Sequence, residues 1–163
     1  MKFAFVLAAA GALALAACET TSAPAQESGP VSISLERTVC FGRCPSYSVT
    51  IDGAGYVTYN GARFVGTSGE RHGKASREDV QALLHAFDAV RFESLRDEYR
   101  AHVTDLPSTI VTLTRNGHTK RVVDYAGVSV GMPEAVRDIE EQIDRVANTQ
   151  QWVAGGERSD IER

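Results

Sequence analysis

Apolar and polar side chains alternate along the first third of the chain that follows residue 30, and this period is typical of half-buried strands. Glycines separate the alternating runs, and glycine supplies the positive φ of tight turns. Consecutive strands joined by short turns indicate an antiparallel meander. The predicted strands are residues 31–36, 47–51, 56–59 and 62–67, with turns at residues 52–55 and 60–61.

Two later stretches have the period of an amphipathic helix. Ser76 is expected to cap the first helix, because Asp79 follows three residues later as in a capping box. Pro133 stands where the first residue of the second helix is expected. The predicted apolar faces are Val80, Leu83, Leu84, Phe87 and Val90 in the first helix, and Val136, Ile139, Ile143 and Val146 in the second.

A hairpin is predicted between the two helices. Residues 108–115 and 118–125 read as strands on either side of Asn116-Gly117, which is the sequence signal of a type I′ turn. Strands, helix, hairpin and helix without regular βα alternation predict an α+β fold. We therefore expect an antiparallel sheet, built from the meander and the hairpin, with two main helices packed on one face. The other segments are predicted as loops at residues 68–74 and 127–131 and a short helical turn carrying Phe92, Leu95 and Tyr99.

The first residues predict an export signal. Residues 3–17 are wholly apolar or glycine after one lysine, and they are too few for the ~20 residues of a membrane span. The run ends in Leu-Ala-Ala-Cys at Cys18, which resembles the lipobox of bacterial lipoproteins. That resemblance implies a lipid on the Cys18 thiol, and Glu19 in place of Asp implies the outer membrane. The alternative is an ordinary secretory signal cut near Ala17, which leaves a free thiol.

A spacer is predicted after the lipobox. Residues 19–30 carry no apolar side chain larger than Ala or Pro, so they cannot bury enough surface to fold. As a flexible chain they would hold the domain on the order of 20 Å from a bilayer. The predicted organisation is a signal peptide at residues 1–17, the lipidated cysteine and tether at 18–30, one domain at 31–153 and a polar tail at 154–163, with Trp152 at the edge of the core.

Charge narrows the class of partner. The formal net charge is −4, and removal of Lys2 with the signal leaves 16 basic against 21 acidic residues, or −5. A mildly acidic domain without a basic stripe argues against nucleic acid as the partner. We expect instead a membrane, reached through the lipid on Cys18, and a protein of the cell envelope.

Two cysteines lie in the connection between the first two strands. Cys40 and Cys44 follow an export signal, so they would fold in an oxidising compartment. In an extended strand their Cα atoms would be about 13 Å apart, whereas a disulfide needs roughly 4.4–6.8 Å. The loop must therefore turn, which Gly42 permits. We predict a structural disulfide that stabilises the domain by about 2 kcal/mol.

Two other uses of these cysteines remain open. Thiol exchange normally uses C-x-x-C at a helix N-terminus, whereas here a C-x-x-x-C spacing leads into a strand. The second alternative use is copper binding, because thiolates are good ligands for Cu(I) and a C-x-x-x-C-P sequence occurs in copper-delivery proteins of the thioredoxin fold. The βαβ context of those proteins is missing here. The histidines available as a further ligand are His72, His85, His102 and His118.

A family resemblance rests on a set of short motifs. They are Cys40-x-Gly42-x-Cys44-Pro45-x-Tyr47, the Asp52-Gly53 turn, Thr104-Asp105-x-Pro107, and the Asn116-Gly117 hairpin with Asp124-Tyr125. Together they resemble the domain-of-unknown-function 6438 family of bacterial secreted proteins and lipoproteins. The resemblance covers residues 31–147, and it implies an envelope location and a shared fold but no activity.

Three further residues are candidates for binding or structural roles. Asp105 precedes Leu-Pro and is expected to bond local backbone N–H groups, whereas Asp124 is expected to pair with Lys120 or Arg121. A catalytic carboxylate pair is the functional alternative for these two aspartates. Tyr47 is expected on one sheet face with Tyr56, Tyr59 and Phe64, as core packing or as a surface for a protein partner.

The sequence carries none of the common motifs of zinc sites, serine nucleophiles or phosphate loops. We therefore expect no cofactor, no metal and no enzyme activity. The hypothesis is a binding or structural module, with a periplasmic thiol-redox or copper-binding protein as the alternative.

Overall fold

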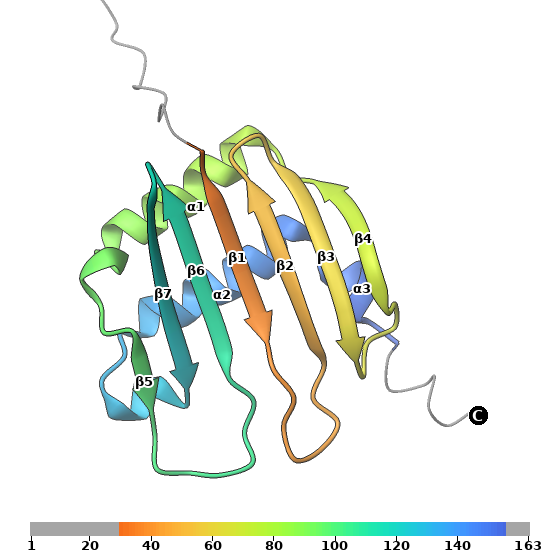
Figure 1. Cartoon of the computed structure of the whole chain (residues 1–163), viewed down its shortest axis with the longest axis vertical. Coiled ribbons are helices and arrows are strands. Elements are labelled where there is room, and N and C mark those ends of the chain that lie inside the picture. Colours follow the sequence, from red (N-terminus) through yellow and green to blue (C-terminus); the bar gives the residue numbers. More distant parts are fainter. Residues whose placement is uncertain (1–29, 156–163) are drawn as a thin grey trace, which may run out of the picture.

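The computed structural model describes residues 30–155 as one mixed sheet with helices against one of its faces (Figure 1). The sheet has seven strands in the order β4-β3-β2-β1-β6-β7-β5. Neighbouring strands pair antiparallel except β5 and β7, which are parallel. The predicted α+β class is confirmed. The predicted signal peptide, Cys18, most of the tether and the end of the polar tail lie outside the described residues.

The strands are β1 (Ser32–Arg37), β2 (Ser46–Asp52), β3 (Tyr56–Arg63), β4 (Gly69–Lys74), β5 (Glu98–Arg100), β6 (Thr109–Arg115) and β7 (His118–Tyr125). The helices are α1 (Arg77–Ala89), α2 (Glu134–Ala147) and α3 (Gln150–Val153), with 3-10 turns η1 (Phe92–Ser94) and η2 (Gly127–Val130). No helix within residues 30–155 is both long enough and apolar enough to cross a membrane.

The core lies between the sheet and the two long helices. Alternate residues of the central strands are buried on the helix side, as the period-2 pattern predicts. Helix α2 contacts β1 and β2, and it also contacts α1. The predicted cap of α1 is confirmed, because Ser76 Oγ accepts from the backbone N–H of Asp79 at 3.0 Å. The Asn116-Gly117 turn is confirmed too, with φ of 53° and 80°.

The predicted turn at Asn60-Gly61 and the predicted strand over residues 62–67 are wrong. Strand β3 runs straight through Gly61, and β4 occupies residues that the pattern predicted as loop. Tertiary packing explains the difference. A Cβ at Gly61 would lie 2.2 Å from the carbonyl oxygen of Thr67, so this glycine permits a close backbone approach and makes no turn.

The end of the chain and the edge of the sheet hold further differences. Tyr99 belongs to the short strand β5 and not to a helical turn, because its backbone pairs with β7. Pro133 occupies the N-cap position, one residue before α2 begins. The short helix α3 was not predicted, although Trp152 does close the core edge, stacked on Tyr59 with ring centroids 4.9 Å apart. Tyr56 is on the opposite face of the sheet from Tyr59 and is 63% exposed.

Candidate functional site

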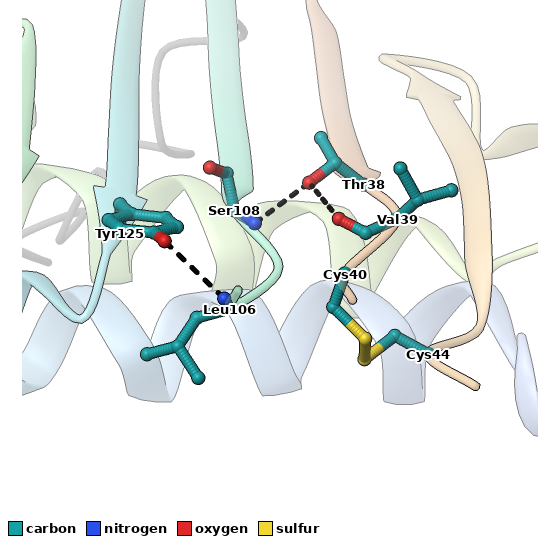
Figure 2. Close-up of a disulfide and its surroundings, with 7 residues drawn as sticks. All are labelled: Thr38, Val39, Cys40, Cys44, Leu106, Ser108 and Tyr125. Carbon is teal, nitrogen blue, oxygen red and sulfur yellow. Dashed lines mark hydrogen bonds between the residues drawn. A yellow bond between two sulfur atoms is a disulfide. The ribbon is translucent and has the colours of Figure 1, made fainter. Parts of the chain in front are cut away.

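The loop of residues 38–45 joins β1 to β2 at one end of the sheet. Cys40 and Cys44 form a disulfide within it, with their Cα atoms 5.7 Å apart (Figure 2). The predicted turn of this loop and the predicted pairing are confirmed. Both sulfur atoms are therefore engaged in a covalent link that holds the short loop closed, which supports the structural interpretation of the two cysteines.

This disulfide loop is hydrogen-bonded to the loop of residues 101–108, which joins β5 to β6. The backbone N–H of Thr38 donates to the carbonyl of Ser108 at 3.0 Å, and that of Phe41 donates to the carbonyl of Asp105 at 3.1 Å. In return, the N–H of Ser108 donates to the Thr38 hydroxyl at 2.8 Å (Figure 2). Two segments far apart in sequence thus form one connected surface at this end of the sheet.

Apolar side chains are exposed on both of these loops. Phe41 is 88% exposed, and three aliphatic side chains nearby on the loops are each 46% exposed. Large apolar side chains in solvent raise the free energy unless something covers them, and grouped ones mark interaction sites more often than single ones do. We call this group the loop surface. Its members are Val39, Phe41, Val103 and Leu106.

A hydrogen-bonded network lies behind the disulfide loop and ties α2 to the sheet. Arg37 of β1 forms a salt bridge with Asp144 of α2 at 2.8 Å. The Tyr47 hydroxyl donates to the same carboxylate at 2.7 Å, and so does the hydroxyl of Thr149. The remaining Arg37 donor Nη1 reaches the hydroxyl of Thr109 at 3.1 Å. Three strands and one helix therefore meet at a single ion pair.

The electrostatics of this network favour its charged form. Burial lowers the pKa of Arg37, but the nearby negative charge of the Asp144 carboxylate raises it, and the net shift of the Arg37 pKa is upward. Burial together with the negative charge of Asp144 also raises the pKa of Tyr47, so the phenol keeps its proton and acts as a donor. Tyr47, predicted as a core or binding residue, is 94% covered and serves the core.

A cavity of about 260 Å³ opens beside this network and next to the loop surface. It lies between α2 and the ends of the strands, and Leu106 belongs both to its wall and to the loop surface. The cavity is lined by Arg37, Leu106, Pro107, Thr109, Asp124, Ala126, Arg137, Glu140 and Glu141.

The two predicted aspartates have different surroundings. Asp124 lines the cavity, whereas the Asp105 carboxylate accepts from the Thr104 hydroxyl at 3.0 Å and is not part of the cavity wall. The expected pairing of Asp124 with Lys120 is wrong. Four residues along a strand span about 13 Å, and Lys120 instead bonds Asp97 at 2.5 Å.

The proposed Arg121 partner is wrong as well, since odd and even residues of a strand point to opposite faces. The carboxylate of Asp124 instead accepts from the backbone N–H of Gly127 at 2.5 Å, and its second oxygen lies 4.0 Å from Arg137 of α2. Asp124 is thus held by the turn after its own strand and by the helix that covers it.

Glu140 of α2 is the most unusual group in the cavity wall. The residue is 3% exposed, and its buried Oε1 atom has no hydrogen-bond partner among residues 30–155. Burial raises the pKa of Glu140 to about 8, and the negative charge of Asp124 acts in the same direction. Three smaller effects lower the pKa of Glu140: the charges of Arg37 and Arg137, and a hydrogen bond with Thr109. The carboxyl is therefore largely protonated near neutral pH.

The sequence did contain a signal for Glu140 that pattern reading missed. Glu140 follows four residues after Val136 and directly after Ile139, so it lies on the apolar stripe of α2. A carboxyl group on such a stripe is buried when the helix packs, and a buried carboxyl group must be either protonated or paired. Asp144 stands in the same relation to Glu140, one helical turn further on, and it is the paired case.

Metal binding has no additional support in this region. Among residues 30–155, no group of three or more His, Cys, Asp and Glu side chains is placed to hold a metal ion. The four histidines are distributed over β4, α1, the 101–108 loop and β7.

We predict that replacing both loop cysteines, Cys40→Ser with Cys44→Ser, lowers the free energy of unfolding by about 2 kcal/mol and leaves the fold intact. The reason is that opening so small a ring returns limited entropy to the unfolded chain. Urea denaturation followed by circular dichroism measures the change. Reductant added to the wild-type protein should reproduce it, and an unchanged midpoint would contradict the structural role.

We predict that stability falls between about pH 5 and pH 8 because of Glu140. Its folded pKa of about 8 exceeds the ordinary value of 4.5, so the folded state binds the proton more tightly and loses that advantage as the pH rises. Glu140→Gln should remove a decline on the order of a few kcal/mol, so the variant is the more stable protein at about pH 8. Urea titrations at several pH values measure this, with exposed Asp138→Asn on the same helix as the control. Parallel curves for wild type and Glu140→Gln would refute it.

Comparison with known protein families gives a match. A family model described as "Domain of unknown function (DUF6438)" matches residues 31–147, which is more than half of the chain and includes the disulfide, the Arg37–Asp144 ion pair and Glu140. A search of curated proteins finds no match. The expected resemblance is confirmed, and the chain belongs to the DUF6438 family.

Proposed function

We propose that this protein is a lipid-anchored component of the bacterial cell envelope, that its domain is a binding module and not an enzyme, and that the loop surface docks an envelope protein. The observation that carries the proposal is the exposure of Phe41, at 88%, on a loop closed by a disulfide. The lipobox-like sequence ending at Cys18 supports the anchor and the address.

The position of the loop surface favours a protein over the anchoring membrane. The described chain enters β1 at the end of the sheet opposite the disulfide loop (Figure 1). A strand of six residues extends about 20 Å, and the tether adds a distance on the order of 20 Å. The loop surface thus faces away from the point of attachment, where a protein of the envelope can reach it.

The loop surface is held in place before any partner binds. The disulfide closes one loop, backbone hydrogen bonds join it to the other, and the N–H of Leu106 donates to the Tyr125 hydroxyl at 3.3 Å. Rigid contacts lose little conformational entropy on binding. Two loops are also small against the ~800 Å² that each partner buries in a stable complex, so the docked protein must contact the domain beyond the loop surface as well.

We predict that a photo-crosslinking phenylalanine derivative at position 41 captures a second, different envelope protein in intact cells. The matched control is the same derivative at Tyr56, which is 63% exposed on β3 near the other end of the sheet. Mass spectrometry of the crosslinked product identifies the partner. Capture of a second copy of this chain, of lipid alone, or of the same products at both positions would overturn the docking proposal.

We predict that Cys18→Ala prevents anchoring. The variant should take up no labelled fatty acid and should leave the membrane fraction, because no thiol remains to carry the lipid. Fractionation and acyl labelling of wild type and variant measure both effects. A variant that still sediments with membranes and still incorporates the label would show that the address is wrong.

A further inference from the structure

We propose that the cavity beside the loop surface binds a primary ammonium group on a short apolar stem, with Glu140 and Asp124 as its acceptors. The ammonium belongs either to a lysine side chain of the docked partner or to a free alkylamine. The lysine source rests on the proposed function, whereas the ammonium site itself does not.

The unpartnered oxygen of Glu140 is the first step of the argument. Nearly all buried polar atoms have a hydrogen-bond partner, so a buried carboxyl oxygen without one marks a place where a partner is missing. Among residues 30–155, Glu140 Oε1 is such an atom, in a residue 3% exposed that lines the cavity. An ammonium group brings three donors and no acceptor, so it fits an acceptor-rich wall.

Asp124 supplies the second acceptor. Its Oδ1 takes one hydrogen bond, from the N–H of Gly127, and its Oδ2 lies 4.0 Å from Arg137, beyond hydrogen-bond distance. An ionised carboxylate has about four lone-pair positions, so Asp124 retains accepting capacity toward the cavity. Asp124 and Glu140 both line the cavity, so the two carboxyl groups can act on one ligand.

The charges around the cavity favour a cation. Arg37 is neutralised by its salt bridge to Asp144, and Glu141 pairs with Arg145 at 3.5 Å on the same helix. That leaves Arg137 against Asp124 and Glu140. With Glu140 ionised the balance is negative, and a cationic ligand restores neutrality, whereas a carboxylate ligand would face two like charges.

The volume of the cavity and the apolar part of its wall indicate the size and the stem of the ligand. The volume of about 260 Å³ is below the roughly 300–1,000 Å³ of pockets for drug-sized ligands, so it suits one side chain or one small molecule. Leu106 and Pro107 provide apolar contact for a methylene stem. Leu106 also belongs to the loop surface, so a lysine presented by a partner on that surface has a continuous path inward.

Binding is accompanied by the release of a proton. The neutral Glu140 carboxyl gives its proton to solvent, and its carboxylate then accepts hydrogen bonds from the ammonium, which keeps its own charge. The groups that face Glu140 are Asp124 from β7, Arg37 from β1, Thr109 from β6 and Arg137 from α2. Of these, Asp124 disfavours the ionised carboxyl, whereas both arginines and the Thr109 hydroxyl favour it.

Calorimetry with paired probes tests the site on the purified full chain in detergent. Nα-acetyl-lysine methylamide and n-pentylamine should bind saturably, and Nα-acetyl-norleucine methylamide, which has the same four-carbon stem without the ammonium group, should not. The affinity for the lysine probe should rise at least about tenfold from about pH 6 to about pH 9, while its amine stays mostly protonated. Buffers of different ionisation enthalpy should report proton release.

Variants assign the site to its residues. Glu140→Gln should lose at least about tenfold in affinity for the lysine probe and should lose the proton release, while Asp138→Asn on the same helix should change neither. Ala126→Leu, which narrows the cavity and removes neither carboxyl group, should also abolish binding. Folding of each variant is checked by its NMR amide spectrum. Equal binding of the lysine and norleucine probes, or lysine binding that survives both Glu140→Gln and Ala126→Leu, would overturn the site.

The two proposals fail separately. Crosslinking at position 41 without binding of any amine probe refutes the ammonium site and leaves the docking surface intact. Probe binding without crosslinking refutes the docking surface and assigns the site to a free alkylamine. Crosslinking that is weakened by Glu140→Gln, but not by Asp138→Asn, supports the lysine of the partner as the ligand.

Discussion

The half-buried ion pair between Arg37 and Asp144 is the interaction on which the functional end of the molecule depends. It joins the end of β1 to α2, and through Tyr47 and Thr109 it also engages β2 and β6. Breaking one partner of such a pair leaves an uncompensated charge, so the geometry is held firmly. Because Glu140 lies one helical turn before Asp144, the ion pair also places the unpartnered carboxyl over the cavity.

The disulfide and the ion pair have complementary effects. Cys40–Cys44 fixes the shape of a loop that has no regular structure of its own, and backbone hydrogen bonds transfer that order to the 101–108 loop. The ion pair fixes α2 behind them. An exposed apolar surface and a charged cavity therefore share one wall, at Leu106, which is the arrangement that a binding site for an amphipathic group requires.

Sequence reasoning predicted what depends on local chemistry. Alternation located β1 and β2, capping placed Ser76, the Asn116-Gly117 turn placed the hairpin, and the cysteine spacing predicted the disulfide. Sequence reasoning failed where contacts between segments far apart in the chain determine the secondary structure. Gly61 lies within a strand because of the close approach of Thr67, and the parallel pairing of β5 has no local signature. The cavity was missed for the same reason, since its wall comes from three strands, two loop segments and one helix.

The energetics of Glu140 separate a structural role from a functional one. If Glu140 served packing alone, an apolar side chain at this position would give a more stable fold, because burial of an unpartnered polar atom destabilises the folded state. Asp144, on the same helical face, is an acid that the fold does stabilise, because three side chains donate hydrogen bonds to its carboxylate. Glu140 has the same scaffold but lacks that saturation at Oε1 among residues 30–155, and the ammonium group that we propose as ligand would supply the missing interaction.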